Sequence, residues 1–129
     1  MVTNYDAKDT TIVVDGVFIT GLAEDMISGE KEEDLFSASV GAQGDVVKST
    51  TNNPLGKITI NVQVTSPQRK FLMALANRTE PFPIWCVNKK LDERMGGTMA
   101  NLLTFPEISR GAEAGDMEFV FQVFDYSVE

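Results

Sequence analysis

Residues 57–65 read KITINVQVT, and this stretch decides the fold class of the chain. Apolar and polar side chains alternate along it without a break. The apolar positions are Ile58, Ile60, Val62 and Val64, and the polar positions are Thr59, Asn61, Gln63 and Thr65. A period of two predicts a β-strand with one buried and one solvated face, which is typical of antiparallel sheets. The stretch therefore predicts a mainly β fold.

Hairpin and strand patterns lie on both sides of this stretch. Asp15-Gly16 separates two β-branched and apolar runs, 10–14 and 17–21, and such a loop is typical of a tight hairpin. Residues 34–51 predict a second hairpin with its tip at 41–45, followed by a turn at 52–56. Further strands are predicted at 82–88, 98–105 and 116–126, with loops at 89–97 and 106–115. On the last strand an apolar face (Met117, Phe119, Phe121 and Val123) lies opposite Glu118 and Gln122.

One α-helix is predicted at about residues 67–77. Ser66 is a good N-cap and Pro67 is tolerated at the first helical position, while Asn77 can end the helix. Its apolar stripe consists of Phe71, Leu72 and Leu75. A helix this short is marginal alone, so we expect it to pack against the sheet.

Charge is distributed unevenly along the chain. Residues 24–34 hold six carboxylates against Lys31, with Ser28-Gly29 inside, and this composition predicts a solvated loop. Residues 107–129 are also acidic. Residues 66–94 are basic, with six basic residues against three acidic ones. Acidic and basic surfaces on one subunit can meet head-to-tail, and such contacts build rings or filaments.

Composition limits the classes of protein that remain. The chain has 129 residues, a formal net charge of −8, no His and one Cys. We expect one domain over residues 1–129, because the length suits one core and no internal repeat or linker is visible. No apolar run approaches the ~18 residues of a membrane helix, and the N-terminus lacks the pattern of a secretory signal. Cys86 cannot form an internal disulfide and is expected to be a small core residue.

The same residues argue against an enzyme and against a cofactor. The absence of His removes Ser-His-Asp and Cys-His sites and most zinc sites. The adjacent pairs Glu24/Asp25, Glu32/Glu33 and Asp92/Glu93 are expected to be solvated surface. Gly41-Ala-Gln-Gly44 lacks the Lys-Ser/Thr of a phosphate-binding loop, and Glu30, Glu32 and Asp34 lack the spacing of a Ca²⁺ loop. A net charge of −8 also argues against binding nucleic acid over a broad surface.

Six stretches of the chain carry a family resemblance. They are VDGVFITGLAEDMISGEKEED (14–34), SVGAQGDVV (39–47), NNPLGKITINVQVTSPQ (52–68), FPIWCVNKK (82–90), ERMGGT (93–98) and EFVFQVFDYSVE (118–129). Together, and in this order, they resemble the tail tube proteins of contractile-tailed bacteriophages. Similar tubes occur in type VI secretion systems and contractile bacteriocins. The resemblance spans nearly the whole chain, and is weakest over residues 99–117.

The resemblance implies an antiparallel β-sandwich or barrel-like fold with one flanking helix. It implies a structural subunit of the virion tail tube, assembled in the host bacterial cytoplasm, without catalytic activity. Six such subunits form a ring, and stacked rings enclose a β-lined lumen that conducts DNA and holds the tape-measure protein. The implied partners are further copies of the chain, the contractile sheath, the baseplate and the tail terminator. Alternatives are a tube terminator, a baseplate tube initiator of the same fold, or a soluble adaptor domain.

Within such a tube, the residues predict three surfaces. Strand alternation predicts lumen-facing side chains at Ser37, Ser39, Thr59, Asn61, Gln63, Glu118 and Gln122; in a monomer the same residues would face bulk solvent. Gly-bearing and acidic loops predict contacts between rings or subunits at Glu24, Asp25, Glu30, Glu32, Glu33, Asp34, Gly41, Gln43, Gly44, Asp45, Asn53 and Pro54. A basic surface for the sheath, or for an acidic loop of another copy, is predicted at Lys89, Lys90 and Arg94.

Overall fold

The computed structural model describes residues 2–129, and most of its regular structure is β-strand. The strands are β1 (Thr10–Val14), β2 (Val17–Phe18), β3 (Leu22–Lys31), β4 (Phe36–Val40), β5 (Val46–Thr50), β6 (Gly56–Gln63), β7 (Phe82–Asn88), β8 (Glu93–Leu102), β9 (Asp116–Val123) and β10 (Ser127–Val128). The helical segments are η1 (Ala7–Asp9), α1 (Arg69–Ala74) and η2 (Leu75–Asn77). The predicted mainly β fold is confirmed.

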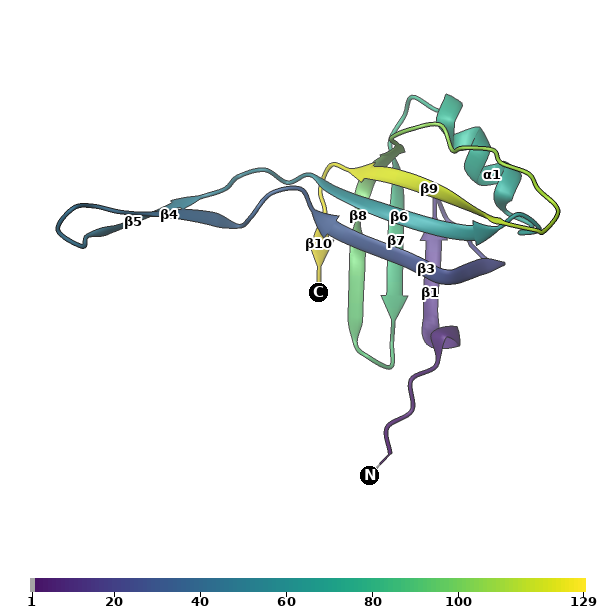
Figure 1. Ribbon diagram of the computed structural model, residues 1–129, viewed down its shortest axis with the longest axis horizontal. Coiled ribbons are helices and arrows are strands. Elements are labelled where there is room, and N and C mark those ends of the chain that lie inside the picture. Colours follow the sequence, from purple (N-terminus) through teal and green to yellow (C-terminus); the bar gives the residue numbers. More distant parts are fainter. Residues whose placement is uncertain (1) are drawn as a thin grey trace.

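One antiparallel sheet contains all strands except β4 and β5. Its strand order is β2-β1-β7-β8-β9-β6-β3, and β10 pairs with β8. In Figure 1 the strands β3, β6 and β9 run across β1, β7 and β8, so the sheet turns at the β8–β9 pairing. Strands β4 and β5 form a separate two-stranded hairpin that projects away from the body of the molecule. We call residues 33–51, which contain this hairpin, the arm.

The hydrophobic core lies between the two halves of the sheet and α1. Its buried side chains are Ile12, Val14, Ile19, Ile58, Ile60, Val62, Leu72, Leu75, Phe82, Ile84, Ala100, Met117, Phe119, Phe121 and Val123. Phe82 and Phe121 join the halves edge to face, with ring centroids 6.0 Å apart. The alternation predicted for β6 and β9 is confirmed, although Val64 lies beyond the end of β6 and is only partly buried.

The first hairpin is confirmed in detail. Asp15 and Gly16 have φ values of 51° and 79°, and two successive positive φ angles are typical of the type I′ turn that joins twisted strands. The Asp15 N–H donates to the carbonyl of Pro83 at 2.8 Å, and the Asp15 carboxylate pairs with Arg78. Strand β2 is shorter than predicted and ends at Phe18.

The prediction of a solvated loop over residues 24–34 is wrong. Residues Leu22–Lys31 form β3, the edge strand beside β6, and only Glu32–Asp34 lie outside it. An edge strand can keep carboxylates in water on its open side, so acidic composition does not exclude a strand there. Gly29 fits because Met95 and Tyr126 occupy the space that a side chain would need.

Other boundaries also differ from the prediction. The helix begins at Arg69 rather than Pro67, because the Ser66 hydroxyl donates to the carbonyl of Thr20 at 2.6 Å and Gln68 takes the N-cap position. The predicted loop 89–97 is a short turn before β8, because the Asn88 side-chain oxygen accepts from the N–H groups of Lys90 and Leu91. Strand β8 ends at Leu102 rather than at residue 105, and β9 ends at Val123 rather than at residue 126.

Candidate assembly surfaces

A polar face covers the outside of β3, β6 and β9. Residues directly opposite one another in an antiparallel pair share a face. The pairs on this face are Ser28–Thr59, Glu30–Lys57, Thr59–Val120, Asn61–Glu118, Gln63–Asp116 and Lys57–Gln122. The structure therefore brings together five predicted lumen residues, namely Thr59, Asn61, Gln63, Glu118 and Gln122. Three carboxylates against one lysine make the face acidic.

Asn61 also holds a β-bulge in place. Four residues of β3, 23–26, lie opposite Asn61 alone, between the pairs Leu22–Val62 and Ile27–Ile60. The Asn61 side-chain amide donates to the Asp25 carbonyl at 2.9 Å and so satisfies a backbone group that the bulge leaves unpaired.

Ser37 and Ser39 lie apart from the other predicted lumen residues. They are on β4, in the arm, where the register places them beside Ser49 and Val47. The opposite face of the arm is more apolar and carries Phe36, Ala38, Val40 and Val46.

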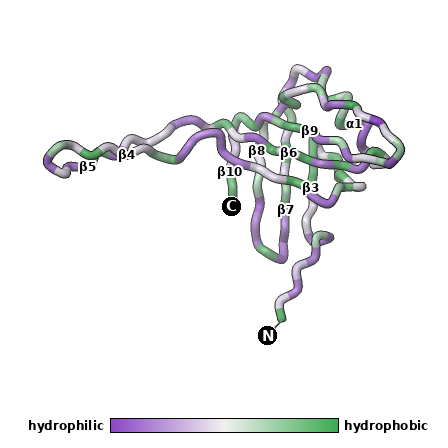
Figure 2. Tube along the Cα trace, in the orientation of Figure 1, coloured by the Kyte–Doolittle hydropathy of each residue, from purple (hydrophilic) through white to green (hydrophobic). Residues whose placement is uncertain are grey.

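Every residue of β4 and β5 is exposed. The predicted tip at 41–45 is confirmed: Gly41 N–H donates to Asp45 at 2.8 Å, and Gly44 N–H donates to Gly41 at 2.9 Å. Figure 1 shows the arm extending from the body, and Figure 2 shows apolar segments along it. A two-stranded hairpin alone is marginally stable in water, so this arm is suited to packing against another molecule.

The remaining predicted loop residues divide between a strand and the root of the arm. Glu24, Asp25 and Glu30 are on β3 and are not loop residues. Glu32 precedes the arm, and Glu33 and Asp34 are its first two residues; Gln122 donates to the Glu32 carboxylate at 2.8 Å. Asn53 and Pro54 form the returning root, where the Pro54 carbonyl accepts from Tyr126 at 3.1 Å.

Strand β3 also leaves one edge of the sheet open. It has ten residues and only β6 as a neighbour, whereas the other edge is the two-residue β2. An open edge presents unpaired N–H and C=O groups that can pair with another chain. Beside it, a groove of about 700 Å³ is lined by Thr59, Asn61, Glu118, Glu24, Asp25, Met26, Ile27 and Ser28 and by the N-terminal Tyr5, Ala7 and Thr10.

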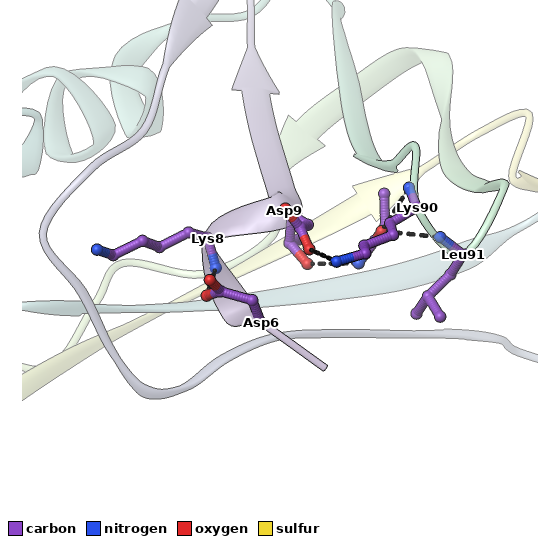
Figure 3. Close-up of polar contacts among 7 residues, drawn as sticks. Asp6, Lys8, Asp9, Lys90 and Leu91 are labelled. Carbon is purple, nitrogen blue, oxygen red and sulfur yellow. Dashed lines mark hydrogen bonds and ion pairs between the residues drawn. The ribbon is translucent and has the colours of Figure 1, made fainter. Parts of the chain in front are cut away.

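The predicted basic residues gather around the β7–β8 turn. Lys90 Nζ forms an ion pair with the Asp9 carboxylate (Figure 3), with a separation of 3.9 Å. The Arg94 guanidinium lies 4.1 Å from the Trp85 ring centre and 3.8 Å from the Glu129 carboxylate. Lys89 and Lys90 border a groove of about 700 Å³ whose other lining residues are Asp9, Thr11, Val13, Phe18 and Val87. We call Lys89, Lys90 and Arg94 the basic cluster.

A second basic groove, which the sequence pattern does not predict, lies beside α1, and we call it the α1 groove. It has a volume of about 630 Å³ and is lined by Arg69, Lys70, Met73, Ala74, Asn77, Phe105, Pro106 and Ile108. Phe105 and Ile108 are exposed and belong to the loop 103–115. The basic character of residues 66–94 was a signal for this groove, but the partner loop is more than 25 residues away in sequence.

Groups suited to chemistry are sparse in the part of the chain that is described. Burial, followed by the nearby Glu93, raises the pKa of the Cys86 thiol to about 11, so the thiol is protonated at neutral pH. Residues 2–129 contain no group of three or more Cys, Asp or Glu side chains placed to hold a metal ion. No helix among them is long and apolar enough to cross a membrane.

Comparison with known families gives the identity of this arrangement. Residues 10–88 match the family described as "Bacteriophage PhiTE tail tube protein". The chain belongs to this tail tube family. The match covers the first hairpin, β3, the arm, β6, α1 and β7; it therefore includes the whole open edge strand and two of the three strands of the polar face, but not β9.

Solved structures resemble the whole tail tube chain. A chain of the PVC sheath–tube complex, an extracellular contractile injection system in its extended state, has a TM-score of 0.65 at 14% identity, covering 98% of this chain and 91% of that one. A chain of the PVC sheath/tube terminator has 0.63 at 12% identity, with coverage of 99% and 98%. The tube-terminating cap of the anti-feeding prophage has 0.64 at 11% identity, with coverage of 100% and 94%. A comparison with curated protein sequences gives no match.

Family membership and fold agree on a structural role. A tail tube protein is a structural component of a phage or phage-like particle, and the three similar chains come from sheath–tube and tube-terminating assemblies. The resemblance noted from the sequence is confirmed at the level of family and fold.

Proposed function

We propose that residues 1–129 act as one tail tube domain, the repeating subunit of a tube built from stacked hexameric rings. The observation that carries the proposal is the polar face of β3, β6 and β9 beside an open edge strand. Joining such sheets edge to edge gives a continuous wall with one polar surface, and the shared edges satisfy backbone groups that are open in the free subunit.

The polar face is proposed to line the lumen. It carries Glu30, Asp116 and Glu118 against Lys57, with uncharged Thr59 between them. An acidic wall repels phosphate, so DNA can pass without being retained, whereas a basic wall would bind it. The same channel would hold the tape-measure protein before DNA passes.

The outer surfaces are proposed to meet the other parts of the tail. The arm and its roots contact neighbouring copies, and the basic cluster contacts the sheath. The ends of the tube meet the baseplate and the terminator. These roles place the chain in the virion tail, after assembly in the host cytoplasm, and they require no catalytic activity and no cofactor.

Electron microscopy of the purified chain at high concentration tests this proposal. Hollow tubes with six subunits per ring are the expected result. A protein that stays monomeric, both alone and with added baseplate, would overturn the tube proposal and favour an adaptor role.

A tube terminator is the second candidate, since two of the similar structures are a terminator and a terminating cap. The same experiment separates the two functions. A terminator gives one closed ring that does not elongate, whereas a tube subunit gives rings that stack without limit. A baseplate tube initiator would likewise stop at one ring, and would bind baseplate rather than tube ends.

A further inference from the structure

The α1 groove and the arm lie at opposite ends of the long axis of the molecule. Figure 1 places the arm at one end of this axis and α1 at the other, with the loop 103–115 passing beside α1. A contact between two different surfaces at opposite ends of a subunit is heterologous, and repeating it adds copies in one direction. A tube subunit needs a contact of this kind between rings.

The arm tip, taken here as residues 40–47, has apolar side chains on either side of the 41–45 turn and carries one charge. Val40, Val46 and Val47 are 69%, 65% and 61% exposed. Asp45 is the only charged residue between positions 35 and 47. No ion pair of residues 2–129 involves Asp45, so its carboxylate is available to a partner.

The α1 groove has the complementary chemistry. Its floor is apolar, with Met73, Phe105 and Ile108, and its rim carries Arg69 and Lys70 without a lining carboxylate. Phe105 is 75% and Ile108 58% exposed. Covering these two side chains removes apolar surface from water, which favours binding. Within the part of the chain that is described, neither rim residue forms an ion pair.

The groove at the basic cluster is a weaker match for the same tip. Asp9 lies inside it and pairs with Lys90, which reduces the positive charge available to an incoming carboxylate. Arg94 is already stacked on Trp85 and faces Glu129.

We propose that the α1 groove is the docking site for the arm tip of a second copy of this chain. Val40 and Val46 cover Phe105 and Ile108, and Asp45 pairs with Lys70 or Arg69 at the rim. The inference rests on the proposed tube function and deepens it, because it names both halves of the contact between rings.

Charge reversal at the two ends tests the contact. Lys70→Glu and Asp45→Lys are each expected to raise the concentration needed for tube formation about tenfold, because like charges then meet in the contact; this corresponds to roughly 1.4 kcal/mol. The double variant Asp45→Lys/Lys70→Glu restores an opposite-charge pair and is expected to recover assembly close to wild type. Assembly is measured by sedimentation and electron microscopy.

The matched control is Lys8→Glu, which makes the same charge change elsewhere. The Lys8 ammonium extends away from its neighbours in Figure 3, and assembly is expected to be unchanged. Normal assembly of Lys70→Glu, or equal loss in the Lys8→Glu control, would overturn the docking site while the tube function stands. Normal tubes of Lys70→Glu that no longer bind sheath would assign the groove to the sheath instead. Failure of the wild type to form tubes would count against the tube function itself.

A second measurement does not depend on finished tubes. Carbodiimide joins a carboxylate to an amine without a spacer, so it is expected to couple Asp45 to Lys70 in concentrated protein. Mixing isotopically heavy and light chains identifies the coupling as one between copies. Coupling of Asp45 to Lys89 or Lys90 instead, or no coupling of Asp45 between copies, would overturn the proposal.

Discussion

The Tyr126 side chain packs against the core and occupies the space beside Gly29 and Gly56. A side chain at Gly56 would meet the Tyr126 ring, and one at Gly29 would meet both Met95 and the Tyr126 hydroxyl. Burial, followed by the charge of Glu30 and then Cys86, raises the pKa of Tyr126, as expected for a partly buried phenol beside a carboxylate. The C-terminal turn is thereby fixed to the root of the arm.

Gly56→Ala is therefore expected to destabilise the protein by about 1–3 kcal/mol, because the added methyl group overpacks the site. Gly56 does not have a positive φ, so the loss is steric. Urea unfolding of the monomer measures it, with Gly111→Ala as the control, since nothing lies near Gly111. Adding Tyr126→Ala should remove the penalty of Gly56→Ala, and additive losses would contradict this explanation.

Asp125 fixes the end of β9 to β8. Its carboxylate accepts from the Thr98 N–H at 3.0 Å, the Thr98 hydroxyl at 2.5 Å and the Met99 N–H at 3.1 Å. Burial acts to raise the pKa of Asp125, but these hydrogen bonds outweigh it and hold the pKa below its usual value.

Asp125→Ala is expected to cost about 1–2 kcal/mol of unfolding free energy at pH 7, as hydrogen bonds to a charged group are lost. Because the folded pKa is lowered, the stabilisation is complete above the unfolded pKa of about 4 and is lost as the pH falls through the folded value. Urea unfolding from pH 7 to pH 2 should therefore show the two curves converging in acid. The control Glu113→Gln should keep the wild-type profile, and a gap that is constant with pH would contradict the role of the carboxylate.

Local pattern was sufficient to predict several elements. β6, β7 and β9 were predicted because alternation of apolar and polar residues depends only on the strand itself. β3 was missed because its carboxylates are accommodated by an open edge, which depends on strand order. Strand pairing likewise decided which candidate residues meet: it gathers Thr59 and Glu118 on one face but leaves Ser37 on the arm.

The arm is an element that contributes to assembly rather than to the core. Among the described residues its strands pair with each other and with no strand of the main sheet. Replacing residues 35–50 with a short Gly-Ser turn is expected to leave the thermal unfolding of the monomer nearly unchanged and to abolish tubes. Circular dichroism and electron microscopy check the two parts. The control, Ser37→Ala on the less apolar face, should still assemble; cooperative unfolding lost on deletion would contradict the separation of arm and core.

On the scale of the whole molecule, the basic cluster is expected to bind the sheath. Lys89→Glu/Lys90→Glu should form tubes of normal length but retain less of the cognate sheath, because opposite charges at the contact become like charges. Co-sedimentation of preformed tubes with sheath measures this. Lys8→Glu, a charge reversal outside the basic cluster, is the control, and equal loss of sheath by this variant and by Lys89→Glu/Lys90→Glu would contradict a specific contact.

The proposed lumen can be located by accessibility in the subunit and in the tube. Thr59 lies at the centre of the polar face, and unlike Asn61 its side chain does not hold the β-bulge. Thr59→Cys is expected to react with a bulky maleimide in the subunit. Inside a long tube the reaction is expected to be at least about tenfold slower, because the reagent enters only at the ends.

Cys86 adds little background labelling in this experiment, because its pKa of about 11 keeps the thiol protonated. Thr11→Cys, on the outer surface, should react in both states. Equal labelling of Thr59→Cys in subunit and tube would place the polar face on the outside and require another surface to line the channel.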